Sequence, residues 1–211
     1  MYTLYGIEGS GSAAIEAALD LAGARYVVVR TASWEPGSDF DRLLALNPTG
    51  LVPTLQMPDG SVLTESAAIL IHLAEKHPGS GLLPGEPPAR AQAIRALVFI
   101  AAHCYAAIGI IDYPERWCEG CDSATAERIR KGARARLHRS WEIFADTFPA
   151  RPWLGSTDLG ASDLLAAVVS KWSGARAHLA RTRPAFHALL TAIEKHPRVA
   201  PVFDRHWPPA A

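Results

Sequence analysis

The segment from Asn47 to Ser66 constrains the fold of this chain more than any other, because it alternates turn residues with short apolar runs. Residues 47–50 (NPTG) have turn chemistry, since proline presets φ and Asn and Gly tolerate unusual backbone angles. Residues 51–55 (LVPTL) predict a short strand. Pro53 cannot donate a ladder hydrogen bond, so it belongs at a strand start or edge. An extended, peptide-like ligand is one candidate partner for that edge.

The second half of the segment predicts a hairpin followed by a helix. Asp59-Gly60 is a turn signal between two strands at residues 55–57 and 62–63. Residues 64–66 (TES) precede the apolar run 67–71 (AAILI), which indicates a helix start. A polar Glu-Ser pair at a helix N-terminus, beside an unpaired strand edge, makes a small site for a charged, peptide-like molecule.

The whole pattern over residues 47–66 resembles the glutathione site of the cytosolic glutathione transferases. This resemblance implies that the peptide bond before Pro53 is cis. It implies that the backbone of Val52 pairs with the cysteinyl part of glutathione. It also implies that Glu65 and Ser66 hold the γ-glutamyl end.

Composition excludes several classes of protein. The chain has 211 residues, of which 49% are hydrophobic, so it can bury a full core and is neither disordered nor fibrous. Its 21 basic and 21 acidic residues cancel, which gives no general attraction to nucleic acid or to an anionic membrane.

The same sequence carries no targeting signal that we recognise. No apolar run reaches the ~20 residues that span a bilayer, and residues 1–5 do not begin a signal peptide. Three Cys residues do not make a disulfide framework. We therefore expect a cytoplasmic protein.

The first part of the chain alternates strand-like and helix-like patterns. Residues 2–5 and 25–30 predict strands, and residues 12–22 and 40–46 predict helices. With the hairpin and the helix from Ser66, the order is β-α-β-α-β-β-α. This is the order of a thioredoxin-like α/β domain, which we assign to residues 1–79.

Residues 80–88 are dense in Pro and Gly and predict a linker. Strand signals largely vanish afterwards, so residues 89–211 predict an all-helical (all-α) domain that carries the acceptor-substrate site. The expected helices are residues 89–109, 123–148 with Ser123 as cap, 161–176, 183–195 and 199–205.

The resemblance extends to a capping box at the start of a buried helix in the second domain. Asp163 can bond back to the helix start, and Leu159 and Leu164 can form a hydrophobic staple. Gly160 stands where the family has Ser or Thr, and glycine offers no side-chain acceptor. We expect this departure to weaken the cap slightly.

Glutathione chemistry requires a thiolate, which a hydroxyl and a helix N-terminus can stabilise. The loop 6–12 (GIEGSGS) supplies Ser10 and Ser12 and no Cys. Ser10 lies where the bacterial beta-type transferases have cysteine, so the resemblance makes it the candidate catalytic residue. Ser12 is expected to be the N-cap of the helix, and Tyr5 is an alternative hydroxyl. Without a cysteine here, chemistry through a mixed disulfide with the protein is disfavoured.

Aromatic residues are candidates for the rest of the pocket. Beta-type transferases have a histidine on the first long helix of the second domain that faces the cleft, and Tyr105 aligns with it. His103 lies two residues earlier, so the two side chains cannot share a face. Trp34 is a candidate cover for the glycyl end of glutathione. Trp172 could line the acceptor pocket, although core packing is favoured.

Cys118 and Cys121 form a C-x-x-C pair, which is found in redox and zinc sites. The pair does not lie at the start of the first helix, where a thioredoxin-like redox pair belongs. Cys104 and His103 are the only nearby extra ligands, and both fall inside a predicted helix. A surface loop with incidental thiols and no metal is the favoured interpretation.

The resemblance implies an enzyme that adds glutathione, as co-substrate, to small hydrophobic electrophiles, or that uses it to reduce peroxides. A glutathione-dependent isomerase or dehalogenase and a non-catalytic binding module are the alternatives. Residues 10–19 lack the serine-cysteine-rich signature of the maleylacetoacetate isomerases. The resemblance also implies a homodimer. Leu70, Leu97 and Val98 have helical spacing that suits either a core or an interface.

Overall fold

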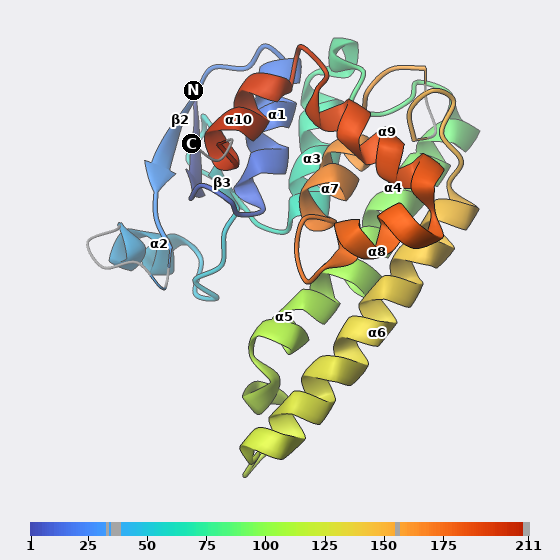
Figure 1. The fold of residues 1–211 in the computed structure, drawn as a ribbon. Helices are drawn as coiled ribbons and strands as arrows, with labels where there is room; N and C mark the ends of the chain where they lie inside the picture. The colour runs from blue at the N-terminus through green and yellow to red at the C-terminus, as the bar shows by residue number, and fades with distance from the viewer. Residues whose placement is uncertain (33, 35–38, 155–156, 209–211) are drawn as a thin grey trace.

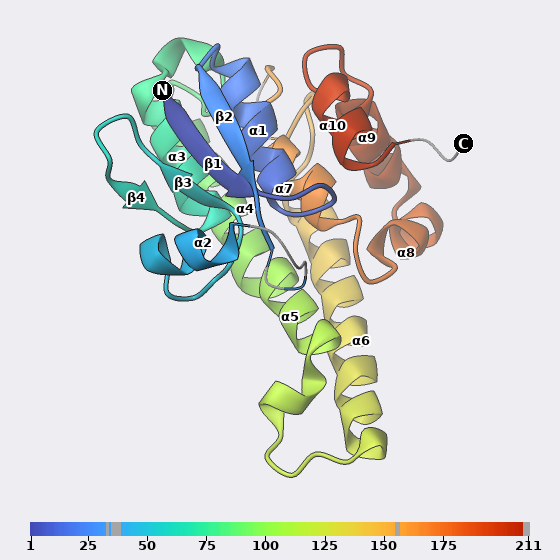
Figure 2. The same ribbon diagram turned by 90° about the vertical axis from the view of Figure 1, so that its left-hand side faces the viewer.

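The computed structural model describes residues 1–32, 34, 39–154 and 157–208. A sheet with the order β2-β1-β3-β4 forms its N-terminal part. The strands are β1 (Tyr2–Gly6), β2 (Tyr26–Arg30), β3 (Thr54–Gln56) and β4 (Val62–Leu63). β1 is parallel to β2 and antiparallel to β3, and β4 is antiparallel to β3. β1 is therefore paired on both sides and lies between β2 and β3 in the sheet (Figure 2).

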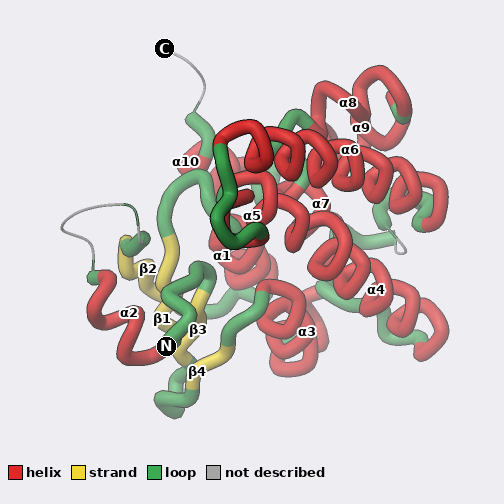
Figure 3. Tube along the Cα trace, turned by 90° about the horizontal axis from the view of Figure 1, so that it is seen from below, coloured by secondary structure: helices red, strands yellow, loops and turns green. Residues whose placement is uncertain are grey.

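Three helices cover this sheet on its two faces. α1 (Ser12–Leu21) and α3 (Ser66–Lys76) lie on one face, and α2 (Phe40–Leu46) lies on the other (Figure 3). The resulting order β-α-β-α-β-β-α is the predicted one, and the thioredoxin-like fold is confirmed. The alternation of β1 explains the layering, since Leu4 joins the core under α1 and α3 while the ring of Tyr5 lies under Arg42 of α2.

The rest of the described chain is helical, as predicted. α5 and the long α6 extend away from the sheet as a pair (Figure 1). The elements are η1 (Pro78–Ser80), α4 (Pro87–Phe99), the π-helical η2 (Ile100–Tyr105), α5 (Ala106–Asp112), η3 (Pro114–Trp117), α6 (Ser123–Thr147), α7 (Ala161–Val169), α8 (Ala175–Thr182), α9 (Pro184–Glu194) and α10 (Ala200–His206).

Three local predictions were wrong. Ser12 is the first residue of α1 rather than its N-cap, which is Gly11. Asp122, not Ser123, caps α6, because its carboxylate accepts the backbone N–H of Thr125 at 2.7 Å. The single helix expected over residues 161–176 is two helices, α7 and α8. Ser173 and Gly174 separate them with φ angles of 56° and 77°, which no α-helix accommodates.

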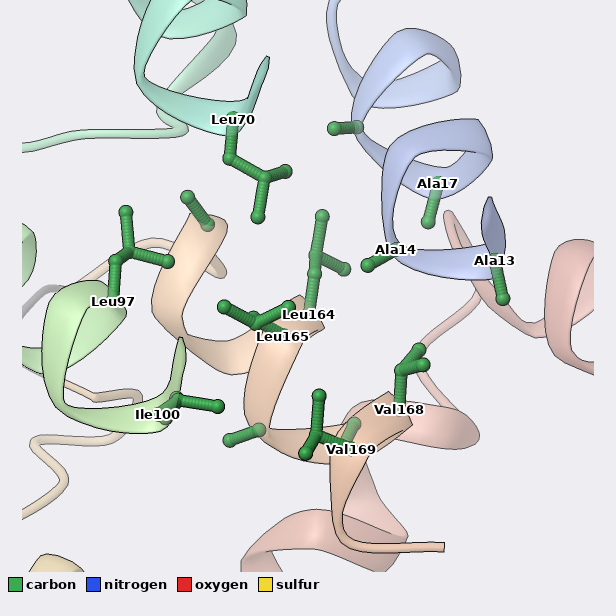
Figure 4. Packing of buried hydrophobic residues seen from close by; sticks show 14 of the residues in the cluster. Ala13, Ala14, Ala17, Leu70, Leu97, Ile100, Leu164, Leu165, Val168 and Val169 are labelled. Carbon is green, nitrogen blue, oxygen red and sulfur yellow. The ribbon is translucent and has the colours of Figure 1, made fainter. Parts of the chain in front are cut away.

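α7 is the centre of the core, and every one of its residues is buried. Leu164, Leu165, Val168 and Val169 project from it toward α1, α3 and α4 (Figure 4). The side of α1 that faces α7 carries alanines, and these small side chains let the two helices approach closely (Figure 4). The helices of the second part are thereby fixed against those that position the loops of the sheet.

The capping interactions of α7 follow the predicted pattern. The Asp163 carboxylate accepts the backbone N–H of Gly160 at 3.0 Å and that of Leu154 at 2.9 Å. The glycine has a packing reason, because a Cβ on Gly160 would lie 2.9 Å from the carbonyl oxygen of Leu82. A Ser or Thr there would push the two segments apart, so the departure from the family pattern reflects close packing.

One helix departs from the expectation that no segment of the chain is apolar enough to span a bilayer. The continuous helix Pro87–Asp112 is long and apolar enough to cross a bilayer, with a mean hydropathy of 2.0 in its most apolar window. Length and composition are weak evidence for a span, because core helices of soluble proteins pass the same test. In this fold the helix packs against α6 and α7.

Candidate active site

A pocket of about 560 Å³ opens between the loops of the sheet and the helices α5 and α7. It collects the loop before α1, the segment before β3, the start of α3 and the end of the π-helical stretch. All seven residues proposed from the sequence line it: Ser10, Trp34, Val52, Pro53, Glu65, Ser66 and Tyr105. A hollow of about 870 Å³ near the linker is larger, but none of these seven residues borders it.

The turn before β3 is held by the side chain of Asn47, which is almost fully buried. Its amide donates to the carbonyl of Leu51 at 3.1 Å and to the hydroxyl of Thr54 at 2.9 Å. Its amide oxygen accepts the N–H and the hydroxyl of Thr49. One side chain thus satisfies several groups of the turn and fixes the path of the chain into Pro53.

Val52 and Pro53 follow this turn at the edge of the pocket. The peptide bond between them is cis, as the resemblance implied. The pairing of β3 with β1 begins at Thr54, opposite Tyr5, so Val52 lies beyond the end of the ladder. Val52 borders the pocket instead of pairing with β1, and an unpaired segment beside a strand is the kind of edge to which extended ligands bind.

Glu65 and Ser66 follow β4, which pairs antiparallel with β3, and they open α3 at the same pocket. Glu65 is the N-cap and has a φ of 65°, although it is not a glycine. Such a conformation costs of order 1–3 kcal/mol and is concentrated at functional sites. The carboxylate of Glu65 is exposed, while Ser66 is buried as the first helical residue. A carboxylate and free helix N–H groups together suit a ligand that carries both an ammonium and a carboxylate.

Ser10 and Ser12 share one carbonyl in the loop before α1. The hydroxyl of Ser10 donates to the carbonyl oxygen of Ile7 at 2.7 Å, and that of Ser12 lies 3.2 Å from the same oxygen. The two hydroxyl oxygens are 2.8 Å apart. Ser10 borders the pocket, whereas Ser12 lies behind it and is fully buried. The N-terminus of α1 begins immediately after Ser10, so its partial positive charge acts on the same spot.

Tyr105 reaches this loop from the helical part. A Cβ on Gly11 would lie 2.2 Å from the Tyr105 hydroxyl oxygen, so only glycine lets the tyrosine approach so closely. Burial, and then the negative charge of Glu65, raises the pKa of Tyr105 to about 12. The hydroxyl is therefore a neutral donor at physiological pH. Its ring stacks on Trp172 with the ring centroids 5.6 Å apart.

Comparison with known proteins assigns the family. The glutathione S-transferase N-terminal domain family matches residues 4–81. The maleylacetoacetate isomerase of Rhizobium meliloti (strain 1021) is 31% identical over 204 residues, which cover 83% of this chain and 94% of that protein. The chain belongs to the cytosolic glutathione transferase superfamily.

Two further similarities cover almost the whole of this transferase-family chain. The uncharacterized GST-like protein YncG of Escherichia coli (strain K12) is 27% identical over 209 residues, or 98% of each chain. The crystal structure of a glutathione transferase homolog from Sulfitobacter with bound glutathione has a TM-score of 0.83 and 25% identity, and covers 97% of each chain.

Within this transferase fold, two alternative candidates lie outside the pocket. Tyr5 is fully buried and does not line the pocket, and its hydroxyl has no hydrogen-bond partner among the described residues. His103 is exposed and packs its ring on Phe99, 4.7 Å away, so it points away from the cleft that Tyr105 enters. The rule that residues two apart on a helix face different directions is confirmed here.

Several pocket residues were missed or undervalued by sequence reasoning. Trp172 is partly buried and packs against the core, and it also lines the pocket. Asp112, Tyr113 and Leu165 line it too, from the end of α5 and from α7. Burial raises the pKa of Asp112, against the opposing effect of Arg130. No local pattern marks these positions: Asp112 and Leu165 lie in ordinary helical stretches, and Tyr113 and Trp172 lie in the connections that follow α5 and α7.

The three cysteines of this family member lie apart from the pocket. Cys104 is buried, and burial raises the pKa of its thiol. Cys118 and Cys121 are partly exposed in the loop before α6. Among the residues that the structure describes, no group of three or more His, Cys, Asp or Glu side chains is arranged to hold a metal ion.

Proposed function

We propose that this chain is a cytoplasmic glutathione transferase that adds the glutathione thiolate to small hydrophobic electrophiles, with glutathione-dependent peroxide reduction as a second activity. One observation carries the proposal: a single pocket joins a strand-like edge, two helix N-termini and a serine hydroxyl. Each of these features matches one chemical part of glutathione.

Each part of glutathione binds at one wall of the pocket in this proposal. The backbone of Val52 pairs with the cysteinyl unit, and the carboxylate of Glu65 takes the ammonium of the γ-glutamyl end. Ser66 and the N-terminus of α3 take its carboxylate. Trp34, which is 62% exposed at the rim, covers the glycyl end.

The catalytic half assigns thiolate stabilisation to Ser10 and the N-terminus of α1. Each hydroxyl has one proton to donate. If Ser12 donates to the carbonyl of Ile7, then Ser10 can turn its own proton to the sulfur without leaving that carbonyl unpaired. Ser12 thus supports Ser10 as a second donor to the same acceptor. The stabilised thiolate then attacks an electrophile held beside it.

The acceptor binds on the helical side of the pocket. Ile108, Leu165 and Trp172 supply an apolar wall, and Tyr105 adds a neutral hydroxyl donor to it. Apolar walls with few polar groups are typical of sites for small hydrophobic molecules. The hydroxyl of Tyr105 can stabilise negative charge that develops on the electrophile.

Ser10→Ala is expected to lower kcat/KM about tenfold, at the lower end for a hydrogen bond to a charged group, because Ser12 lies close enough to compensate in part. Glutathione affinity should change less. The pH-rate profile should shift to higher pH, since the variant stabilises the thiolate less. Ser61→Ala, at an exposed serine of the hairpin turn, is the control. Coincident profiles for Ser10→Ala and the parent would make Ser10 structural.

A maleylacetoacetate isomerase is the second candidate, because the relative with 31% identity has that name. Both reactions use the same glutathione site and differ in the acceptor. Purified protein should therefore be assayed with glutathione against a panel of electrophiles, peroxides and maleylacetoacetate. We expect conjugation to dominate; turnover of maleylacetoacetate alone would favour the isomerase. Retention on glutathione-agarose without any turnover would favour a binding module.

We further propose a homodimer with the N-terminal part of each subunit packed on the helices of the other. Leu70 and Leu97 are fully buried within one chain and belong to its core, but Val98 is 53% exposed on α4. Light scattering at micromolar concentration should give twice the 22.7 kDa of one chain. In a two-fold interface each contact occurs twice, so Val98→Glu should shift the mass toward the monomer. A monomeric parent with full activity would contradict the dimer.

A further inference from the structure

The C-terminal helix contacts the loop that carries Ser10. α10 lies against α1 (Figure 1), and its last residue, His206, is buried. Nδ1 of His206 accepts the backbone N–H of Gly9 at 3.2 Å. Nε2 of the same ring lies 3.0 Å from Oε2 of Glu16 on α1. One imidazole thus bridges the loop and the helix that together form the proposed thiolate site.

These two contacts define the tautomer of the ring. A backbone N–H can only donate, so Nδ1 of His206 must be unprotonated. The proton then lies on Nε2, where it is donated to the carboxylate of Glu16. The contact with Gly9 therefore requires a neutral ring with its proton on Nε2.

Glu16 is itself held in place as a carboxylate. It is buried, and it forms an ion pair with Arg205 in addition to its contact with His206. Burial by itself would raise its pKa, but the hydrogen bonds from His206 and Arg205 outweigh burial and lower it. A charged carboxylate that interacts with both Arg205 and His206 is a fixed acceptor for the Nε2 proton of His206.

The loop end of the bridge is restricted by its backbone conformation. Gly9 has a φ of +72°, which other residues rarely adopt, and it lies close to the carbonyl oxygen of His206 and to the ring of Trp207. Gly9 is bonded directly to Ser10, and both line the pocket. The orientation of the Gly9 peptide therefore affects where the Ser10 hydroxyl lies.

We propose that His206 is a positioning residue: it holds the Gly9–Ser10 backbone in the conformation that directs the Ser10 hydroxyl at the glutathione sulfur, with Glu16 fixing its tautomer. The inference rests on the proposed function and extends it to the last helix, which supplies no wall of the pocket among the described residues. Loss of the contact between His206 and Gly9 should therefore lower turnover and thiolate stabilisation while glutathione binding is retained.

Two substitutions with amide side chains test the two contacts of His206 separately. His206→Asn keeps an acceptor at the position of Nδ1 and removes the link to Glu16. His206→Gln reaches the position of Nε2 and removes the acceptor for Gly9. We expect His206→Gln to lower kcat about tenfold and to shift the pH-rate profile upward, with the KM for glutathione changed less than twofold. His206→Asn should retain kcat within about threefold of the parent.

His103→Gln is the matched control, because His103 is exposed and faces away from the pocket. Equal losses in His206→Asn and His206→Gln, or no loss in His206→Gln, would overturn the positioning role while the parent remains active. A parent that neither binds nor uses glutathione would instead overturn the proposed function.

A measurement on the parent protein keeps the inference testable if both variants unfold. Nitrogen-15 NMR of the histidine rings distinguishes the two neutral tautomers. We expect the buried His206 to carry its proton on Nε2 at neutral pH. A proton on Nδ1 would rule out the bond from Gly9 and with it the positioning role.

Discussion

Replacing Asp163 with alanine is expected to lower the free energy of unfolding by about 2–4 kcal/mol at pH 7. The substitution leaves the N–H groups of Gly160 and Leu154 without their acceptor in the core, and each unsatisfied buried donor costs about 1–3 kcal/mol. Removing a buried carboxylate offsets part of this loss. Urea unfolding of both proteins measures the difference.

The pH dependence of this difference has a definite sign. Burial raises the pKa of Asp163 to about 6, despite the opposing hydrogen bonds from Leu154 and Gly160. Between about pH 4 and 6 the folded state therefore binds more protons than the unfolded state, so this group contributes less stability as pH rises. The advantage of the parent over Asp163→Ala should widen as pH falls from 7 to 5.

Ser162→Ala is the control for this prediction. Ser162 is the buried neighbour of Asp163, but its hydroxyl makes one bond, to the carbonyl of Ala93 at 3.2 Å. We expect it to cost about 1 kcal/mol, the typical net value of one hydrogen bond, without the same pH dependence. If Asp163→Ala is no less stable than Ser162→Ala, the two bonds of Asp163 do not anchor α7.

Replacing Glu65 with alanine is expected to weaken glutathione binding by about 1.5–3 kcal/mol, the scale of a hydrogen bond to a charged group. The carboxylate is the group that we assign to the ammonium of the γ-glutamyl end. Alanine meets the same backbone penalty as glutamate at a φ of 65°, so the loss should come from the side chain. Calorimetric titration of parent and variant with glutathione measures it.

Glu75→Ala is the matched control, because it removes the same charge from an exposed position further along α3. Its glutathione affinity should equal that of the parent. Glu65→Gly adds a second test, since glycine relieves the unusual φ and should preserve or raise stability while affinity falls. An affinity within twofold of the parent in Glu65→Ala would refute the assignment of the γ-glutamyl end.

The fold was largely predictable because its elements carry local signals. The turn residues and short apolar runs of residues 47–66 predicted β3, β4 and the start of α3, and apolar periodicity predicted most of the helices. The break between α7 and α8 was missed because only Gly174 signals it, while Ser173 adopts a positive φ without any sequence marker. The cap of α6 was misplaced by one residue, since Asp122 and Ser123 are both good caps and tertiary geometry decides between them.

The site was predictable from one local segment and from the positions that the family resemblance suggested for Ser10, Trp34 and Tyr105. Val52, Pro53, Glu65 and Ser66 come from a single local pattern. The acceptor wall depends instead on which faces of α5 and α7 turn toward the sheet, and periodicity alone does not settle that. The bond between Gly9 and His206 joins residues 197 apart in the sequence and is created entirely by the packing of α10 on α1.

The central claim is that this pocket binds glutathione and stabilises its thiolate. Ultraviolet absorbance of the thiolate, followed as a function of pH with glutathione bound to the parent protein, tests it most directly. The proposed roles of Ser10 and the α1 N-terminus predict an apparent thiol pKa at least about one unit below the ~8.5 of a free cysteine thiol. A bound thiol that titrates at or above that value, or the absence of binding, would contradict the claim.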